Sequence, residues 1–170
     1  MVSTALVTVE EYLGANHKPA CEYFDGVLRQ KPMPTRKHGV IQGRLVRLIS
    51  ERFSGFEAGT EITVRLREGK FLVPDLIVQR CDQIQDPYPY SPVHLCVEIL
   101  SPSDKMNEVL TKCEEYHAWG VETTWIVDPD AQRSWEYGRG LRPREVVAGG
   151  SLVAAEIVVP YTDLFSLLQH

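Results

Sequence analysis

The feature that most constrains the fold is an apolar run, VHLCVEILS at residues 93–101, followed by a helical pattern and a second apolar run. Apolar residues recur at helical spacing over 106–119, and Gly120 suits the C-terminal end of a helix. The second run is TTWIVD at 123–128. A strand, helix and strand of these lengths favour two parallel strands joined by a right-handed crossover. The sequence therefore predicts an α/β fold with a central mixed β-sheet flanked by helices.

The rest of the chain supplies further short elements around this unit. Thr8 and Glu11 have the spacing of a capping box, which begins a helix. We expect helices at 8–15, 37–53 and 161–168, a hairpin at 21–30, and strands at 61–67, 71–79, 133–137, 144–148 and 152–159. A length of 170 residues favours one domain over 1–170.

Several classes of protein are disfavoured by simple patterns. Apolar runs are far shorter than the ~20 residues of a membrane span, and the first residues lack the pattern of a secretory signal. The four cysteines are scattered without a C-x-x-C pair, which argues against a zinc ribbon or redox motif. We therefore expect a cytoplasmic protein without a membrane partner.

Charge is distributed unevenly along the chain. The net charge of −5 means that the surface as a whole does not attract nucleic acid. Between residues 27 and 52, however, seven basic side chains stand against one acidic side chain. Arg36, Lys37 and Arg44 in this stretch are candidates for phosphate contacts. The same pattern is also typical of an ordinary solvated helix face.

Two carboxylates interrupt apolar strands. Glu98 lies within VHLCVEILS, and Asp75 follows Pro74 within FLVPDLIV. A carboxylate buried in such a strand is costly unless a metal ion, a lysine or protonation compensates it. Together the two residues could hold one Mg²⁺ or Mn²⁺ ion, both of which prefer oxygen ligands. Alternatively, Glu98 faces solvent or an arginine, and Asp75 accepts local backbone hydrogen bonds.

Three further residues complete a candidate site. Lys112, on the helix that follows Glu98, could supply a cation near a phosphate, or simply extend from the helix to solvent. His38 falls on the inward face of its helix, where histidines also serve as packing residues. Glu22 precedes the turn of the predicted hairpin and is a weaker candidate for the same site.

These pieces resemble the Uma-two family of restriction endonucleases, within the PD-(D/E)XK nuclease superfamily. The resemblance extends from about Thr8 to Leu168. The matching pieces are TVEEYL, EYFDGVL, His38, VPDLIV, CVEILSPSD, K-x-x-x-Y at Lys112 and Tyr116, Gly120-Val121 and TTWIVDP. The resemblance implies a restriction-endonuclease-like fold.

The resemblance also implies a chemistry. Asp75 and Glu98 would be catalytic metal ligands for Mg²⁺ or Mn²⁺, and Lys112 the catalytic lysine, with Glu22 and His38 lining the same cleft. The lysine of an E-x-K motif would fall at residue 100, which is Leu100, so Lys112 on the following helix would replace it. The implied function is a metal-dependent endonuclease that acts on DNA, and superfamily members often form homodimers. Alternatives are an inactive nucleic-acid-binding or assembly protein on the same fold, and a small-molecule hydrolase with the same metal site.

Overall fold

The structure, a computed structural model, describes residues 6–168. The helices are α1 (Val9–Gly14), α2 (Arg36–Arg52), α3 (Met106–Trp119) and α4 (Tyr161–Phe165), followed by a 3-10 turn at Ser166–Leu168. The strands are β1 (Cys21–Phe24), β2 (Val27–Gln30), β3 (Phe56–Thr60), β4 (Val64–Arg67), β5 (Lys70–Leu72), β6 (Leu76–Arg80), β7 (Leu95–Ile99), β8 (Thr123–Asp128), β9 (Arg133–Gly138), β10 (Arg144–Val146), β11 (Ser151–Ala154) and β12 (Ile157–Pro160).

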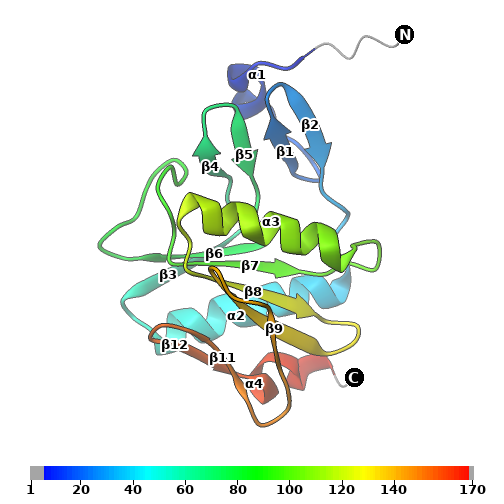
Figure 1. Ribbon diagram of the computed structural model, residues 1–170, viewed down its shortest axis with the longest axis vertical. Coiled ribbons are helices and arrows are strands. Elements are labelled where there is room, and N and C mark those ends of the chain that lie inside the picture. Colours follow the sequence, from blue (N-terminus) through cyan, green and yellow to red (C-terminus); the bar gives the residue numbers. More distant parts are fainter. Residues whose placement is uncertain (1–5, 169–170) are drawn as a thin grey trace.

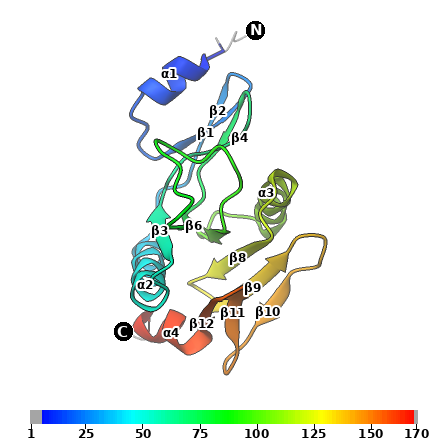
Figure 2. The ribbon, with the colours of Figure 1, turned by 90° about the vertical axis from the view of Figure 1, so that its left-hand side faces the viewer.

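A six-stranded mixed sheet forms the centre of the molecule, in the order β10-β9-β8-β7-β6-β3. Its β7 and β8 run parallel and are joined through α3, whereas the other neighbours in the sheet are antiparallel. Figure 2 shows α2 and α4 on one side of this sheet and α3 on the other. The prediction of an α/β fold with a central mixed sheet flanked by helices is confirmed.

Strand β7 is buried on both faces because helices cover both sides of the sheet. Leu95, Val97 and Ile99 belong to the large core that includes the apolar face of α2. Cys96 points the other way and packs against residues of α3. Since side chains alternate along a strand, Glu98 shares the α3 side with Cys96. The apolar alternation of this strand therefore directs its one carboxylate toward α3.

A second sheet, in the order β2-β1-β5-β4, is antiparallel and lies at the end of the molecule that carries α1 (Figure 1). The prediction of one continuous strand over 71–79 is wrong, because β5 belongs to this sheet and β6 to the central one. Val73, Pro74 and Asp75 form the break between them. Pro74 has no backbone N–H to give to a ladder, which suits a position between two sheets. Asp75 therefore lies at the junction of the two sheets.

Three other segments differ from the sequence prediction. The segment 56–60 forms β3 at the edge of the central sheet, although its sequence FEAGT lacks a strand pattern, and the predicted strand 61–67 begins only at Val64. The predicted strand 152–159 is a hairpin of β11 and β12. Its turn contains Ala155 at φ 50°. Neither a two-residue turn without glycine nor an edge strand rich in polar residues has a strong local signal.

The remaining elements follow the prediction closely. Thr8 and Glu11 form the capping box of α1, and Asp25-Gly26 turns the first hairpin. The expected terminal helix divides into α4 and the 3-10 turn. Within residues 6–168, no helix combines the length and apolar character needed to cross a membrane.

Candidate active site

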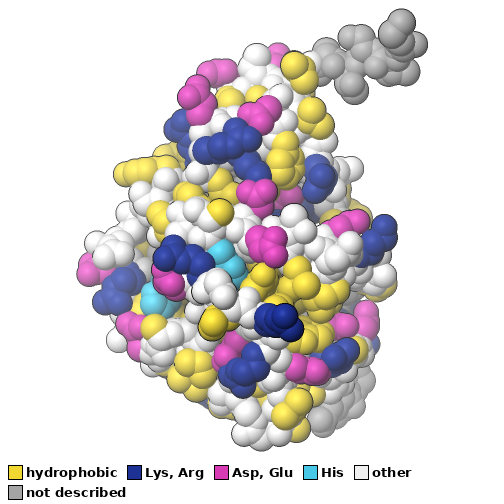
Figure 3. Space-filling view, viewed as in Figure 1, with side chains coloured by type: hydrophobic (Ala, Val, Ile, Leu, Met, Phe, Trp, Pro, Cys, Tyr) yellow, Lys and Arg dark blue, Asp and Glu magenta, His cyan; other side chains and the backbone are white. Residues whose placement is uncertain are grey.

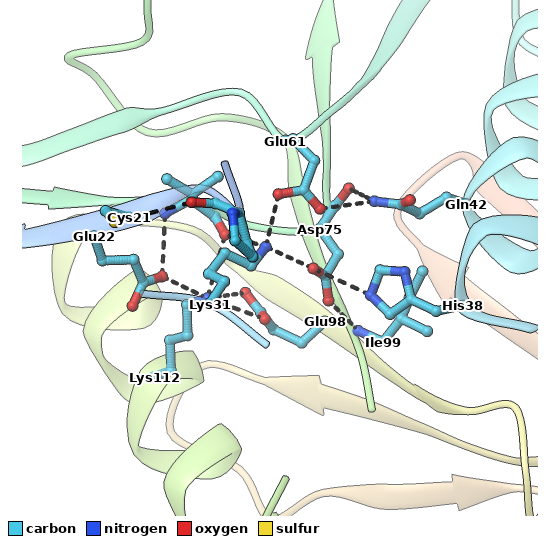
Figure 4. Close-up of polar contacts among 12 residues, drawn as sticks. Cys21, Glu22, Lys31, His38, Gln42, Glu61, Asp75, Glu98, Ile99 and Lys112 are labelled. Atoms are coloured by element: carbon cyan, nitrogen blue, oxygen red, sulfur yellow. Dashed lines mark hydrogen bonds and ion pairs between the residues drawn. The ribbon is translucent and has the colours of Figure 1, made fainter. Parts of the chain in front are cut away.

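The pairing of β6 with β7 brings two carboxylates together. Leu76 is the partner of Val97 at the end of this antiparallel ladder, and Asp75 immediately precedes it, close to Glu98 (Figure 4). The backbone N–H of Ile99 donates to Oδ2 of Asp75 at 2.7 Å. Asp75 is 4% exposed and Glu98 6% exposed, so both acidic groups are buried.

Helix α3 supplies two donors to the Glu98 carboxylate. Lys112 and Tyr116 are one helical turn apart and therefore reach the same group. The Tyr116 hydroxyl donates to Oε1 at 2.6 Å, and the Lys112 ammonium nitrogen lies 3.0 Å from the same oxygen. Burial raises the pKa of Glu98 to about 7, against the opposing charge of Lys112. Protonation and metal binding are thus alternative ways to neutralise this carboxylate.

Asp75 has a different electrostatic environment. Its Oδ1 lies 2.6 Å from the Lys31 ammonium nitrogen and 3.3 Å from Nε2 of His38. Burial opposes ionisation of Asp75, but the hydrogen bond from His38 and the charge of Lys31 outweigh it and hold the pKa of this carboxyl below its ordinary range. Asp75 is therefore the more readily ionised member of the pair.

Two lysines from distant parts of the chain meet at one backbone carbonyl. The oxygen of Val73 accepts from Lys31 at 2.9 Å and from Lys112 at 3.3 Å. Lys31 also pairs with Glu61 at 3.0 Å, and Lys112 with Glu22 at 2.7 Å. Burial would lower the pKa of both lysines, but the nearby carboxylates outweigh it and raise each pKa above its ordinary value. Both side chains are therefore ammonium cations in this cluster.

The first turns of α2 close the site on the side of Asp75. Thr35 caps this helix by accepting from the backbone N–H of His38, whose ring is buried as the sequence predicted. Gln42, one turn further on, donates to Oε1 of Glu61 at 3.0 Å and to the carbonyl of Asp75 at 2.8 Å. Helix α2 thereby fixes both the side chain and the backbone of Asp75.

These groups line one large cavity of about 840 Å³ between the two sheets and α3. Its walls include all five residues predicted for the cleft, namely Glu22, His38, Asp75, Glu98 and Lys112. Lys31, Gln42 and Glu61 line the same cavity and were not predicted as site residues. Lys31 lies in a proline-rich loop, where sequence has no signal for an inward side chain. Gln42 had one available signal, since it lies one helical turn after His38.

The three basic residues predicted to bind phosphate lie away from the cavity lining. Lys37 pairs with Asp130 at 2.7 Å, and Arg44 donates to the carbonyl of Asp163 in α4 at 2.7 Å. Arg36 is exposed at the start of α2. On the face seen in Figure 3, basic and acidic side chains are interspersed. DNA contact by these residues stays a prediction.

The site fits a divalent cation in the kind and charge of its donors. Four carboxylates (Glu22, Glu61, Asp75 and Glu98) face two ammonium groups, so ionisation of all six leaves an excess of two negative charges. The Lys31 ammonium is itself a stand-in cation among three oxygens. Over residues 6–168, no three His, Cys, Asp or Glu side chains form a group that could hold a metal ion as they stand. The three oxygens lie 2.6, 2.9 and 3.0 Å from the Lys31 ammonium nitrogen, at or beyond the upper end of the ~2.0–2.6 Å of metal–oxygen bonds.

Comparison with solved structures defines the class of fold. The chain is 26% identical to a "putative nuclease belonging to DUF820" from Anabaena variabilis ATCC 29413, with a TM-score of 0.80 over 95% of this chain and 99% of that one. A DrdV–DNA complex matches at 15% identity with a TM-score of 0.40, covering 65% of this chain and 12% of that chain. The fold, with its mixed sheet and buried carboxylates, is restriction-endonuclease-like.

The family is also established. A sequence model of the Uma2 family, described as "Putative restriction endonuclease", matches residues 8–164, and the chain belongs to this family. No curated protein matches the sequence. The resemblance stated from the motifs is therefore confirmed for the family and the fold.

Proposed function

We propose that the protein is a metal-dependent endonuclease that hydrolyses phosphodiester bonds of DNA. One observation carries this proposal: Asp75 and Glu98 lie side by side at the wall of a large cavity, with the Lys112 ammonium 3.0 Å from Glu98. Membership of a family described as restriction endonucleases and likeness to a nuclease structure support the reaction class.

Each residue has a distinct proposed role. Asp75 and Glu98 would hold Mg²⁺ or Mn²⁺, with Glu22 close to Lys112 as a further acidic group. When bound, such an ion lowers the pKa of water and stabilises negative charge that develops on phosphate. An ammonium group has only donors, so Lys112 orients water or phosphate oxygen by hydrogen bonding rather than by taking a proton. Ile99 and Tyr116 keep the two carboxylates in place through their hydrogen bonds.

The choice of DNA as substrate follows from the family description. Arg36 and Lys37, at the start of α2, would contact the phosphate backbone beside the turn that carries His38. Such contacts release counterions, so binding would weaken steeply with salt. Lys37 already pairs with Asp130, and the Arg44 guanidinium already donates to Asp163 and Ser166, so each would exchange these partners for a phosphate.

The test is cleavage of supercoiled plasmid with Mn²⁺ or Mg²⁺, using the wild type and the isosteric variants Asp75→Asn and Glu98→Gln. We expect each variant to lose at least about 100-fold in rate, as electrostatic groups at reaction centres typically do. Asp163→Asn is the matched control, because Asp163 is also in a 2.6 Å ion pair but lies outside the cavity lining. Activity that is equal in all four proteins would contradict the proposal, and melting curves would show whether the variants stay folded.

A second candidate function is an inactive nucleic-acid-binding or assembly protein. The observation that favours it is the completeness of the hydrogen bonding: both oxygens of Asp75 and both of Glu98 have partners within the protein. Calorimetric titration separates the two candidates. Mn²⁺ binding that Glu98→Gln removes supports the enzyme, and the lack of binding at millimolar Mn²⁺ supports the inactive protein.

A further inference from the structure

Lys31 occupies a cation position among the carboxylates of the site. The roles proposed for the other site residues do not explain this position. It follows β2 in the chain, and its backbone N–H donates to the carbonyl of Ala20 at 2.8 Å. Its ammonium nitrogen lies 2.6 Å from Oδ1 of Asp75, 2.9 Å from the carbonyl oxygen of Val73 and 3.0 Å from Oε2 of Glu61. The side chain is only 12% exposed. The three oxygens therefore bind the buried Lys31 ammonium group as they would bind a small cation.

The oxygens that bind Lys31 overlap with those proposed for a metal ion. Asp75 is common to both, and its Oδ2 is already engaged by the N–H of Ile99. A divalent ion bound to Oδ1 of Asp75 would lie next to the Lys31 ammonium group, which contacts the same oxygen atom. Two cations at such a distance repel strongly in a buried site. Lys112 adds to this repulsion, because it shares the Val73 carbonyl with Lys31.

The structure provides a destination for a displaced ammonium group. The backbone of Lys31 is anchored by Ala20, but its four-carbon stem is flexible. The side chain forms part of the cavity wall, and so do the neighbouring Gln30 and Pro32. A phosphate in this cavity would neutralise a cation that had left the carboxylates. The same lysine can therefore serve two anions in turn.

We propose that Lys31 holds the cation position at Asp75 until a divalent ion binds, and then turns into the cavity to bind the phosphate of the substrate. This inference rests on the proposed function. It makes Lys31 a competitor of the metal and a partner of the substrate. Removal of its charge should therefore change the two affinities in opposite directions, whereas a merely structural lysine would not strengthen either one.

The test compares Lys31→Met with the wild type in two binding measurements. In calorimetry with MnCl₂ alone, we expect Lys31→Met to bind Mn²⁺ about tenfold more tightly, because a competing unit charge is lost. In saturating Mn²⁺, a fluorescein-labelled phosphorothioate oligonucleotide, which resists hydrolysis, should bind about tenfold more weakly by anisotropy. Lys31→Gln should change both affinities in the same directions, and it replaces Lys31→Met if that variant melts at a much lower temperature.

Lys70→Met is the matched control. Lys70 is also 12% exposed and forms a 2.6 Å ion pair with a carboxylate of the cavity wall, Glu115, but Lys70 itself does not line the cavity and does not contact Asp75. It should leave the Mn²⁺ affinity at the wild-type value. Mn²⁺ binding by Lys31→Met that is equal to or weaker than wild type would overturn the inference, as would unchanged oligonucleotide binding.

Failure of the proposed function would look different. Asp75→Asn should remove Mn²⁺ binding from both the wild type and the Lys31→Met background. If Mn²⁺ binds equally with and without Asp75, the proposed metal site is wrong whatever Lys31 does. If the wild type binds no Mn²⁺ but Lys31→Met does, Lys31 is shown to block the site. If neither protein binds Mn²⁺, both proposals fail.

Discussion

The phenol hydroxyl of Tyr116 donates a hydrogen bond to Oε1 of Glu98 at 2.6 Å, across the interface between α3 and β7. The Tyr116 ring is fully buried, as its place in the helical pattern predicted. The hydroxyl has a second role, because it satisfies a carboxylate that would otherwise be costly in an apolar strand. Packing of α3 on the sheet and positioning of Glu98 thus depend on the same side chain.

Tyr116→Phe should lower the free energy of unfolding by about 1–3 kcal/mol, because it takes one donor from a buried carboxylate. Urea denaturation measures this change. Tyr137→Phe is the control, since the Tyr137 hydroxyl donates over 3.2 Å to Glu114 at the surface, and it should cost less than about 1 kcal/mol. An equal loss of unfolding free energy in the two variants would show that the hydrogen bond to Glu98 stabilises the protein no more than the one to Glu114.

Lys112→Met should be more harmful, because it leaves Glu22 and Glu98 buried without their shared ammonium partner. Breaking a buried ion pair from one side typically costs about 3–5 kcal/mol. The double variant Lys112→Met, Glu98→Gln should recover part of this loss, because one buried charge disappears with its partner. Denaturant unfolding of the wild type, both single variants and the double variant gives the coupling energy. Strictly additive losses would contradict a direct interaction.

Local patterns were sufficient to predict the central unit of the fold. The apolar run around Glu98, the helix that carries Lys112 and the strand 123–128 each have a clear periodicity, and their order defines a crossover. The register that sets Asp75 beside Glu98 is not local. It depends on the chain passing at Pro74 from β5 in one sheet to β6 in the other, which a single apolar run over 71–79 does not reveal.

The site residues that come from polar segments were even harder to predict from local patterns. Lys31 and Glu61 lie 30 residues apart in segments that read as a loop and a strand start, and their ion pair forms only when β2 and β3 are assembled. Gln42 bonds to Glu61 from a third element. A charged residue in a polar segment has no local signal that distinguishes an inward from an outward orientation. The carboxylates in apolar strands could be predicted, because a charged side chain is unexpected among apolar neighbours.

His117 should make the protein sensitive to acid. Its Nε2 lies 3.0 Å from the carbonyl oxygen of Tyr137 and 3.1 Å from Oγ1 of Thr124, which is fully buried. Burial lowers the pKa of His117, although the bond to Tyr137 and the charge of Glu114 oppose this. The other charged groups around the ring are Arg139 and Glu122. The native state therefore binds fewer protons than the unfolded chain below the ordinary histidine pKa of about 6.5, so stability falls as the pH drops through that value.

The measurement is the free energy of unfolding in urea between about pH 7.5 and 5 for the wild type and His117→Gln, because this range spans the ordinary histidine pKa. Glutamine can still donate near the position of Nε2 but does not titrate. The difference between the two curves should be flat above pH 7 and should then change in favour of the variant as the pH falls. Parallel curves over the whole range would show that another group causes the acid sensitivity.

Two glycines at different places in helices should respond in opposite ways to alanine. Gly120 ends α3 at φ 125°, and a Cβ there would come within 2.7 Å of Cγ of Pro92. Gly120→Ala should therefore destabilise the protein by at least about 1 kcal/mol through backbone strain and this clash. Gly43 lies inside α2 with nothing within 4 Å of its Cβ position, so Gly43→Ala should stabilise by up to about 1 kcal/mol. Thermal and urea unfolding measure both changes. A tolerated alanine at position 120 would mean that α3 does not end in this conformation. The contact of Lys112 with Glu98 depends on the packing of that helix, so it would then need a different explanation.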